Sequence, residues 1–564
     1  MNAGTHIHFT WIDWSVLFGY LLLTTWVGHR MRGRQAGIRD FFLGGRSLPW
    51  PAVSGSIIAT EISGITFIGV PAMIFAMNGD FTYLQWAIGS IIGRLIVARY
   101  FIRVYYEQEI YSPYDYMGRR LGGRIKALTT VLFSLGAILG QSVRVLVAAL
   151  PLRVVTGLDL EWCIAIIGAF AVLWTLMGGM RTVIWTDVMQ FFLFVAGGLM
   201  ALIWIIGSLG GGFAEFWETA SRYSRLDLWD TRLRADLEFT LWVALLAVPF
   251  QNVSVFGVDQ LNAQRMFCCR NAKAAAKALV WSCGGQLIAL LMMMVGAALF
   301  VHYHNNPFTA TEAVILFEGD DAATALASME NAPLLANKDG TEISNVRMPS
   351  PGTGDYVFPI WITTVLPVGL SGLVLAGIFA AAISSLDSIL AALSQTTLSL
   401  FYHPERKSDA ELEKLNLVIK AKLLVVFWGV VMTLFTLVLN YAREVQQLPI
   451  LPLAFGMTAY TVGPLLGIML CALVGEASRT GLVVGTCLSL LATLFLRMDV
   501  WVLVEAAGID ISWLAALPSY HLEDGATGSP RTTIATAWAW PAMTLLTFAC
   551  GRLWPKRSET ETAS

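Results

Sequence analysis

Long apolar runs alternate with short polar segments along most of the chain. A bilayer core requires about 20 apolar residues per helix. Runs of this kind lie at about 11–29, 51–77, 81–104, 127–152, 160–177, 184–208, 240–257, 275–302, 358–401, 418–440, 448–473, 480–498 and 534–551. The pattern predicts an all-α polytopic membrane protein with about thirteen transmembrane helices.

The distribution of Lys and Arg indicates the orientation of these helices. The first ten residues carry neither, whereas Arg30, Arg32, Arg34, Arg39 and Arg46 follow the first run. From there the basic residues fall mainly in alternate segments, as expected of loops that stay inside the cell. We therefore expect a multi-pass protein of the plasma membrane, surrounded by the lipid bilayer, with its N-terminus outside and its C-terminus in the cytoplasm.

The composition excludes several classes of protein. Hydrophobic residues make up 56% of the chain, charged residues 13%, and the net charge is −2, whereas soluble domains carry about 25% charged residues. A soluble enzyme, a disordered chain and a nucleic-acid binder with a basic face are excluded on this ground. The sequence has no HExxH motif and no GxSxG-type motif with suitable partners, so it does not indicate a membrane enzyme. It implies no protein partner.

Two of the apolar runs are interrupted at mid-depth by polar or helix-breaking residues. The run at 51–77 contains Ala59-Thr60-Glu61-Ile62-Ser63-Gly64, and the run at 240–257 contains Pro249, Gln251 and Asn252. Breaking the first helix would free carbonyls near Ala59 and Ile62, which are oxygen ligands suited to a hard cation. If the leading run is set aside, these runs begin two five-helix halves, and such a pair indicates the midplane site of a secondary transporter.

The run at 358–401 carries a second polar group. Ser384, Ser385, Asp387 and Ser388 cluster in it, and Ala381, Ser384, Ser385 and Ser388 share one helix face. Their oxygens could form a sodium site. The alternative is that the hydroxyls bond to the preceding turn or hold neighbouring helices together, although an intramembrane carboxylate favours a functional role.

Several motifs together resemble those of the sodium:solute symporter family. They are DFFLGGRSLPW (40–50), ATEISGITFIG (59–69), GGMRTVIWTDVMQ (178–190), DQLNAQRMFCCRNAKAA (259–275) and GLVLAGIFAAAISSLDSILAALS (372–394). The resemblance runs from about 40 to 400 and continues more weakly to about 470.

The resemblance implies the leucine-transporter-type fold, with two inverted repeats of five helices. Residues 1–50 would then be a leading helix and a basic inner loop, and 51–208 the first repeat. Residues 240–473 would be the second repeat with a long outer loop at 303–357, and 474–564 would hold two trailing helices and a cytoplasmic tail.

The resemblance also implies sodium as the coupling ion. Carried over by position, the first sodium site comprises the carbonyls of Ala59, Ile62 and Ala381 and the hydroxyls of Ser384 and Ser385. A second site, present in some members, would use Asp187, Ser384 and Ser388. Asp387 stands where some members have serine, so whether this chain has the second site stays an open question. Asp187 could instead be an acidic residue near a helix N-terminus, where the helix dipole stabilises a negative charge.

Substrate contacts follow from the same family positions. Ser63, Thr66 and Gln85 fit the pattern of sialic-acid carriers, and Asn252 and Gln286 match positions that hold sugar hydroxyls. Each could also be an interhelical hydrogen bond.

The sequence contains two intramembrane charges, Glu61 and Arg144, and the kind of solute carried depends on whether they pair with each other. Arg144 could bind a substrate carboxylate bidentately, which would favour a sialic acid, another sugar acid or a different organic anion. If it pairs with Glu61, a neutral sugar or polyol is favoured. The expected function is sodium-coupled symport of such a small organic solute by alternating access, with a monocarboxylate or vitamin as a further alternative. A channel or a membrane sensor is a remote alternative.

Overall fold

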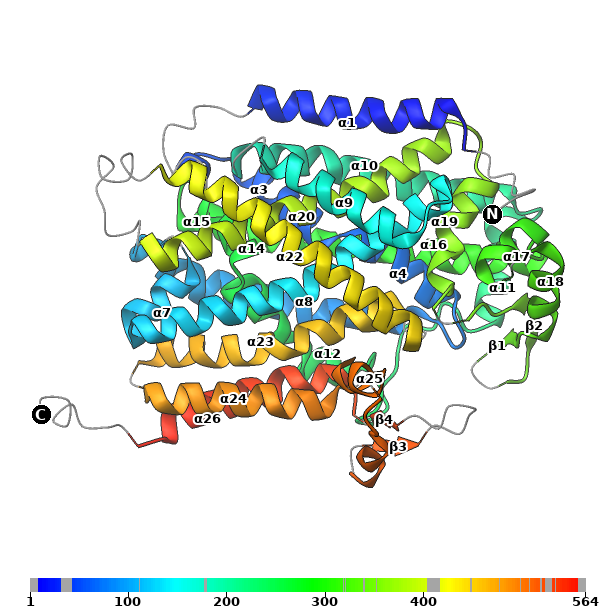
Figure 1. Cartoon of the computed structure of the whole chain (residues 1–564). Helices are drawn as coiled ribbons and strands as arrows, with labels where there is room; N and C mark the ends of the chain where they lie inside the picture. Colours follow the sequence, from blue (N-terminus) through cyan, green and yellow to red (C-terminus); the bar gives the residue numbers. More distant parts are fainter. Residues whose placement is uncertain are drawn as a thin grey trace, which may run out of the picture.

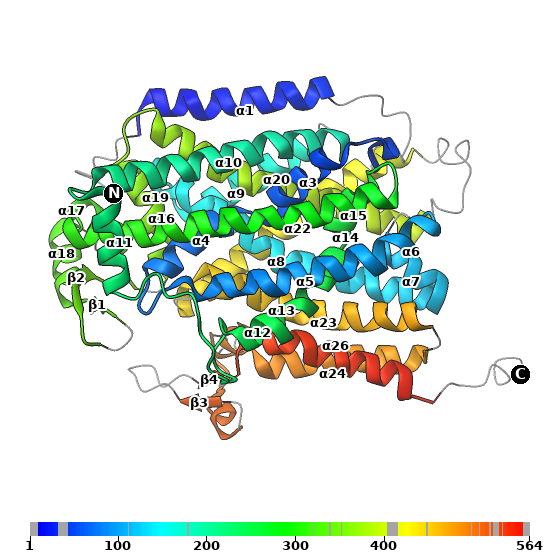
Figure 2. The same cartoon turned by 180° about the vertical axis from the view of Figure 1, so that it is seen from behind.

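The computed structural model describes most of the chain and shows one bundle of helices. The described residues are 9–31, 43–110, 112–176, 180–317, 319, 321–337, 340–350, 352–402, 416–446, 449–475, 477–497, 499–506, 508–517, 520–522, 530–532 and 534–555. Figures 1 and 2 show long helices that run nearly side by side, with the blue helix α1 (Trp11–Met31) along one edge of the bundle next to α10 (Met180–Ser208).

The remaining helices of the first half follow in chain order. They are α3 (Trp50–Glu61), α4 (Gly64–Phe75), α5 (Trp86–Ile96), α6 (Ile102–Glu107), α7 (Pro113–Leu121), α8 (Gly123–Thr156), α9 (Leu160–Thr175) and α11 (Gly212–Arg222). A π-helical turn at Val97–Phe101 joins α5 to α6.

The second half contains the other helices and two small antiparallel strand pairs. The helices are α12 (Leu241–Leu246), α13 (Val248–Val253), α14 (Gln260–Phe267), α15 (Ala272–Trp281), α16 (Gly285–Asn305), α17 (Ala310–Leu316), α18 (Ala322–Asn331), α19 (Val357–Thr364), α20 (Leu370–Tyr402), α22 (Leu417–Gln446), α23 (Ile450–Val474), α24 (Arg479–Leu496), α25 (Asp499–Ala506) and α26 (Ala539–Leu553). Strand β1 (Leu334–Ala336) pairs with β2 (Ile343–Arg347), and β3 (Tyr520–Leu522) pairs with β4 (Pro530–Thr532).

The structure confirms the predicted helical membrane architecture but not the predicted number of thirteen transmembrane helices. Among the described residues, eight helices are long and apolar enough to cross a bilayer, or nine if the bent pair α3 and α4 forms one span. The runs at 11–29, 81–104, 160–177 and 534–551 fall short. For two of them the length explains this, because α9 has 16 residues and α26 has 15. The helical part of the run at 81–104 carries three arginines, Arg94, Arg99 and Arg103.

The long loops between helices gather at one end of the bundle. Helices α11, α17 and α18 and strands β1 and β2 lie at the end where α1 begins, whereas α7 lies at the opposite end (Figure 1). The start of α1 and the predicted outer loop 303–357, which contains α17, α18, β1 and β2, therefore share one end of the molecule. Which side of a membrane this end faces stays a prediction.

Glycines allow two pairs of helices to approach closely. A Cβ atom at Gly89 of α5 would lie 2.2 Å from the carbonyl oxygen of Ala244 in α12. A Cβ at Gly372 of α20 would lie 2.6 Å from the carbonyl oxygen of Asp13 in α1. Larger residues at these positions would force the helices apart.

Candidate functional site

The helix predicted to be interrupted at 59–64 is broken there. Helix α3 ends at Glu61, α4 begins at Gly64, and their axes differ by 51°. Ile62 and Ser63 have extended backbones, and the Ser63 hydroxyl caps α4 by accepting a hydrogen bond from the N–H of Ile65. The last carbonyls of an α-helix lack partners within the helix, so the break exposes backbone oxygens in the middle of the bundle.

The break lies against helix α20, which carries the predicted sodium hydroxyls. A Cβ at Gly64 would lie 3.8 Å from the Cβ of Ala382 and 3.0 Å from the Cγ1 of Val147 in α8. Ala381, Ser384 and Ser385 are all fully buried. The Ser385 hydroxyl donates to the carbonyl of Ala381 at 3.1 Å, which leaves the oxygen of this hydroxyl available to a cation.

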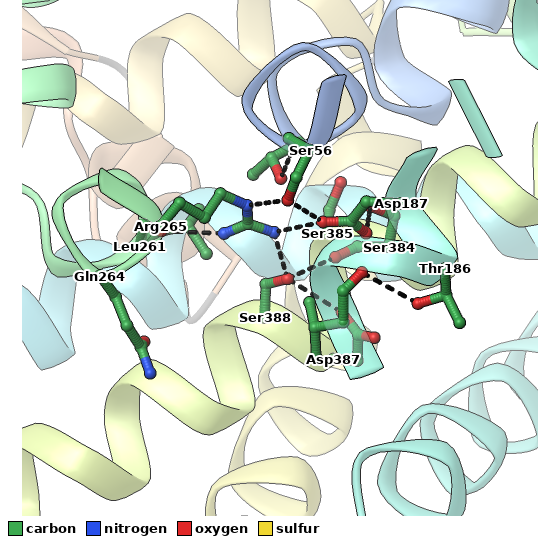
Figure 3. Close-up of polar contacts among 12 residues, drawn as sticks. Ser56, Thr186, Asp187, Leu261, Gln264, Arg265, Ser384, Ser385, Asp387 and Ser388 are labelled. Atoms are coloured by element: carbon green, nitrogen blue, oxygen red, sulfur yellow. Dashed lines mark hydrogen bonds and ion pairs between the residues drawn. The ribbon is translucent and has the colours of Figure 1, made fainter. Parts of the chain in front are cut away.

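The residues predicted for a second sodium ion meet in a buried polar cluster. Asp187 of α10 accepts hydrogen bonds from Ser384 and Ser56 and forms an ion pair of 3.1 Å with the Nη2 of Arg265. Arg265 also donates to Ser388 and, through Nε at 2.9 Å, to Ser56 (Figure 3). The three predicted ligands Asp187, Ser384 and Ser388 are thus brought together, with a guanidinium among them.

Asp387 lies at the margin of this cluster. Its Oδ1 is 2.9 Å from the Ser388 hydroxyl, and within the described part of the chain it forms no ion pair. Arg265 therefore pairs with Asp187 rather than with Asp387.

Most of the predicted substrate residues line one cavity of about 230 Å³ beside the break. Helices α3, α4, α5, α8, α13, α16 and α23 contribute to its wall. The predicted residues in this lining are Glu61, Ser63, Thr66, Arg144, Asn252 and Gln286. Gln85 is not among them, because its amide nitrogen donates to the carbonyls of Thr82 and Phe239 at 3.2 and 3.1 Å.

Glu61 pairs with a different arginine from the one considered in the sequence. Its carboxylate forms an ion pair with Arg94 of α5, whose other nitrogen lies 3.3 Å from the Ser282 hydroxyl. The Arg94 guanidinium also stands over the ring of Phe256, 4.4 Å from its centre. Arg94 is fully buried, so this pair fixes α3 to α5 at the break.

Amide side chains extend this polar wall across the cavity. The Gln286 nitrogen donates to Glu61 at 3.3 Å and to the Ser90 hydroxyl at 3.4 Å. The Ser90 hydroxyl donates to Asn252 at 2.8 Å, and the Asn252 nitrogen donates to Gln251 at 2.7 Å. Residues of α3, α5, α13 and α16 are joined in one chain of hydrogen bonds.

Arg144 faces the same cavity without a carboxylate partner among the described residues. Its Nη1 donates to the freed carbonyl of Thr60 at 2.9 Å. Asp259, which also lines the cavity, interacts with Arg144 only at longer range.

Two buried arginines were not singled out in the sequence. Arg94 lies within the apolar run 81–104, next to Leu, Ile and Val. An arginine in such a run indicates a functional or paired charge, so the sequence could have pointed to this residue. Arg265 lies in the DQLNAQRMF motif, but nothing in the sequence indicates that its side chain turns inward to Asp187.

Comparisons with known proteins agree with this architecture. The sodium:solute symporter family matches residues 41–486. The "Sodium/sialic acid symporter SiaT" of Proteus mirabilis is 28% identical over 87% of this chain and 90% of its own length. The "Sodium/sialic acid symporter NanT" of Aliivibrio fischeri is 25% identical over 86% and 88%.

A solved structure of a Na⁺-coupled sialic acid symporter in a substrate-bound outward-open state has the same fold. Its TM-score is 0.73 at 24% identity, over 97% of this chain and 99% of that one. Because the family match spans most of the sequence, the chain belongs to the sodium:solute symporter family and is a sodium-coupled membrane carrier.

Proposed function

We propose that this chain carries a small organic anion, with a sialic acid or related sugar acid as cargo, and that Arg144 holds the cargo carboxylate. The observation that carries the proposal is the pairing of Glu61 with Arg94, because among the described residues it leaves Arg144 in the cavity wall with only the Thr60 carbonyl as a direct partner. A guanidinium matches a carboxylate bidentately, and an intramembrane charge that forms no direct ion pair is costly unless a ligand completes it.

The rest of the cavity suits the remainder of such a solute. Glu61, Ser63, Thr66, Asn252 and Gln286 offer donors and acceptors to hydroxyl and amide groups. A cavity of about 230 Å³ suits a small molecule rather than a polymer. A neutral sugar or polyol would use the same polar wall but would leave Arg144 unused, and a monocarboxylate would use Arg144 but few of the other groups.

The first sodium ion is assigned to the junction of the break with α20. Its ligands would be the carbonyls of Ala59, Ile62 and Ala381 and the hydroxyls of Ser384 and Ser385. The burial of this region and the contact of Gly64 with Ala382 support the assignment. A second sodium ion at Asp187, Ser384 and Ser388 would have to share these ligands with the guanidinium of Arg265, which already contacts Asp187 and Ser388. The carboxylate of Asp387 lies beside Ser388.

The transport cycle would be alternating access within two inverted five-helix repeats, 51–208 and 240–473, in thirteen spans. The N-terminus would lie outside the plasma membrane and the C-terminus in the cytoplasm. Sodium bound at the break would stabilise the cargo-binding arrangement, so sodium and cargo would raise each other's affinity. Each sodium ion entering at −100 mV gains about 2.3 kcal/mol from the membrane potential.

Uptake into liposomes containing the purified chain tests this function. We expect N-acetylneuraminic acid to accumulate under an inward sodium gradient, and D-glucose and lactate to accumulate far less. Without a sodium gradient, accumulation should stop. Equal uptake with and without sodium would contradict the coupling.

The substitution Arg144→Ala tests the role of this arginine. Loss of a charge-assisted contact of about 1.5–3 kcal/mol corresponds to a rise in the half-saturating N-acetylneuraminic acid concentration of roughly 10- to 150-fold. Arg103→Ala is the matched control, because Arg103 is exposed and pairs only with Glu107. An unchanged half-saturating concentration in Arg144→Ala would refute the anion contact.

A further inference from the structure

The leading helix α1 is joined to the start of α20, the helix that carries the proposed sodium hydroxyls. The Oδ1 of Asp13 accepts hydrogen bonds from the N–H groups of Gly369 and Gly372, at 2.6 and 3.0 Å. The first N–H groups of a helix have no partner within it, and a carboxylate there also interacts favourably with the helix dipole. Asp13 therefore caps α20 from another helix.

The cap is fixed on both sides. The Oδ2 of Asp13 accepts from the N–H and the hydroxyl of Thr10, at 2.9 and 3.0 Å, and Asp13 is fully buried. Gly372 allows the backbones to touch, since a Cβ there would lie 2.6 Å from the Asp13 carbonyl oxygen. A side chain this enclosed has one position, and α20 begins at a place set by α1.

The other end of α1 contacts the helix that carries Asp187. The Thr182 hydroxyl of α10 donates to the carbonyl of Gly28 at 3.3 Å. A Cβ at Gly28 would lie 3.0 Å from the Cγ2 of Thr182 and 3.3 Å from that of Thr186, the residue before Asp187. Figures 1 and 2 both show α1 running along α10 over its length.

Helix α1 thus spans the two helices whose side chains meet in the polar cluster. Ser384 lies 14 residues after the start of α20, and its hydroxyl donates to Asp187. Because a straight helix is rigid along its axis, a shift of its capped start moves these residues by a similar amount. The contacts at Gly372 and Gly28 fix α20 and α10 against the same helix.

We propose that Asp13 is a positioning residue for sodium: through its cap on α20, it holds Ser384 and Ser385 at the correct height beside the break in α3 and α4. The proposal rests on the sodium site assigned above. It gives the leading helix a part in ion binding, although none of its residues touches the ion. Sodium coordination requires several oxygens at once, so a displaced α20 would weaken binding without removing a ligand.

Direct binding of ²²Na⁺ to the purified chain tests the proposal without any cargo. We expect Asp13→Ala to raise the sodium dissociation constant roughly three- to tenfold, since the loss of a helix cap typically shifts an equilibrium by up to about one order of magnitude. Asp13→Asn keeps one acceptor and should restore most of the affinity. Ser15→Ala on the same helix is the control, because Ser15 is exposed and bonds only within α1.

A second variant approaches the same contact from the other helix. Gly372→Ala places a methyl group against the α1 backbone and should weaken sodium binding as Asp13→Ala does. A purely structural role would lower the yield of folded carrier but leave the dissociation constant of the folded fraction unchanged.

The outcomes separate the two proposals. If the unaltered chain binds no sodium, the sodium site itself is wrong. If it binds sodium and both Asp13→Ala and Gly372→Ala keep its affinity, the positioning role is refuted. These two variants alter the contact from opposite helices, so the dissociation constant of either one that folds decides the matter.

Discussion

The ion pair between Glu61 and Arg94 should be a main support of the broken helix. Glu61→Gln removes the carboxylate but keeps an oxygen of similar position. Arg94, whose side chain is 0% exposed, would then keep Ser282 at 3.3 Å, the Phe256 ring at 4.4 Å and the neighbouring Cys283 thiol, all of which are uncharged. The substitution therefore leaves a buried guanidinium without its counter-charge.

The size of the effect follows from burial. Removing one partner of a fully buried pair costs about 3–5 kcal/mol. The Glu61 side chain is 24% exposed, and the uncharged contacts of Arg94 remain, so we expect the free energy of unfolding to fall by about 2–3 kcal/mol. Denaturant unfolding in detergent, followed by tryptophan fluorescence, measures this change.

The chain offers a matched control and a double-mutant cycle. Glu107→Gln breaks the ion pair with Arg103. The side chains of Arg103 and Glu107 are 72% and 58% exposed, so the free energy of unfolding should not change measurably. The double variant Glu61→Gln, Arg94→Gln should lose less stability than the two single variants added together. The reasoning is refuted if Glu61→Gln destabilises the protein no more than Glu107→Gln does.

Three further changes test other parts of the structure. Ser384→Ala should raise the sodium concentration for half-maximal uptake of N-acetylneuraminic acid several-fold while maximal uptake changes little; a loss of maximal uptake alone would contradict its place at the ion. Gly89→Ala puts a Cβ 2.2 Å from the Ala244 oxygen and should lower the free energy of unfolding by about 1–3 kcal/mol, whereas Gly284→Ala, with no atom within 4 Å, should be nearly neutral in the same denaturant assay. Burial raises the pKa of Glu238, in the loop before α12, from 4.5 to about 7. The folded protein therefore binds this proton more tightly than the unfolded chain does. The stability that the bound proton contributes is fully present below pH 4.5 and is lost as the pH rises to about 7. Glu238→Gln should flatten this part of the stability-against-pH curve, and an unchanged slope would contradict the assignment.

Hydropathy and helix-breaking residues predicted much of the architecture. The break at Ala59–Gly64 was visible because Glu, Ser and Gly interrupt an apolar run, and the structure confirms it. The number of spans could not be counted by the same rule. An apolar run predicts that a helix is present but not where it begins and ends, and the runs at 160–177 and 534–551 contain helices of only 16 and 15 residues.

The candidate site was predictable in its residues but not in its pairings. Family positions predicted Asn252 and Gln286, and the cost of intramembrane charges singled out Glu61 and Arg144; the structure brings all four to one cavity. Which arginine meets Glu61 depends on how α3 crosses α5, and sequence distance gives no measure of that. Gln85 shows the converse, because this polar residue lies outside the cavity lining and its amide nitrogen donates to the backbone of Phe239.

The hydrogen bonds among Glu61, Gln286, Ser90 and Asn252 have a consequence for selectivity. Most polar atoms of these groups already bond to one another, although the Oε2 of Glu61 has no hydrogen-bond partner among the described residues. An incoming molecule must therefore exchange partners with most of them, and the net gain is small for a molecule that merely has many hydroxyls. Discrimination among cargoes then depends on whether a molecule can replace several of these bonds at once in the right geometry.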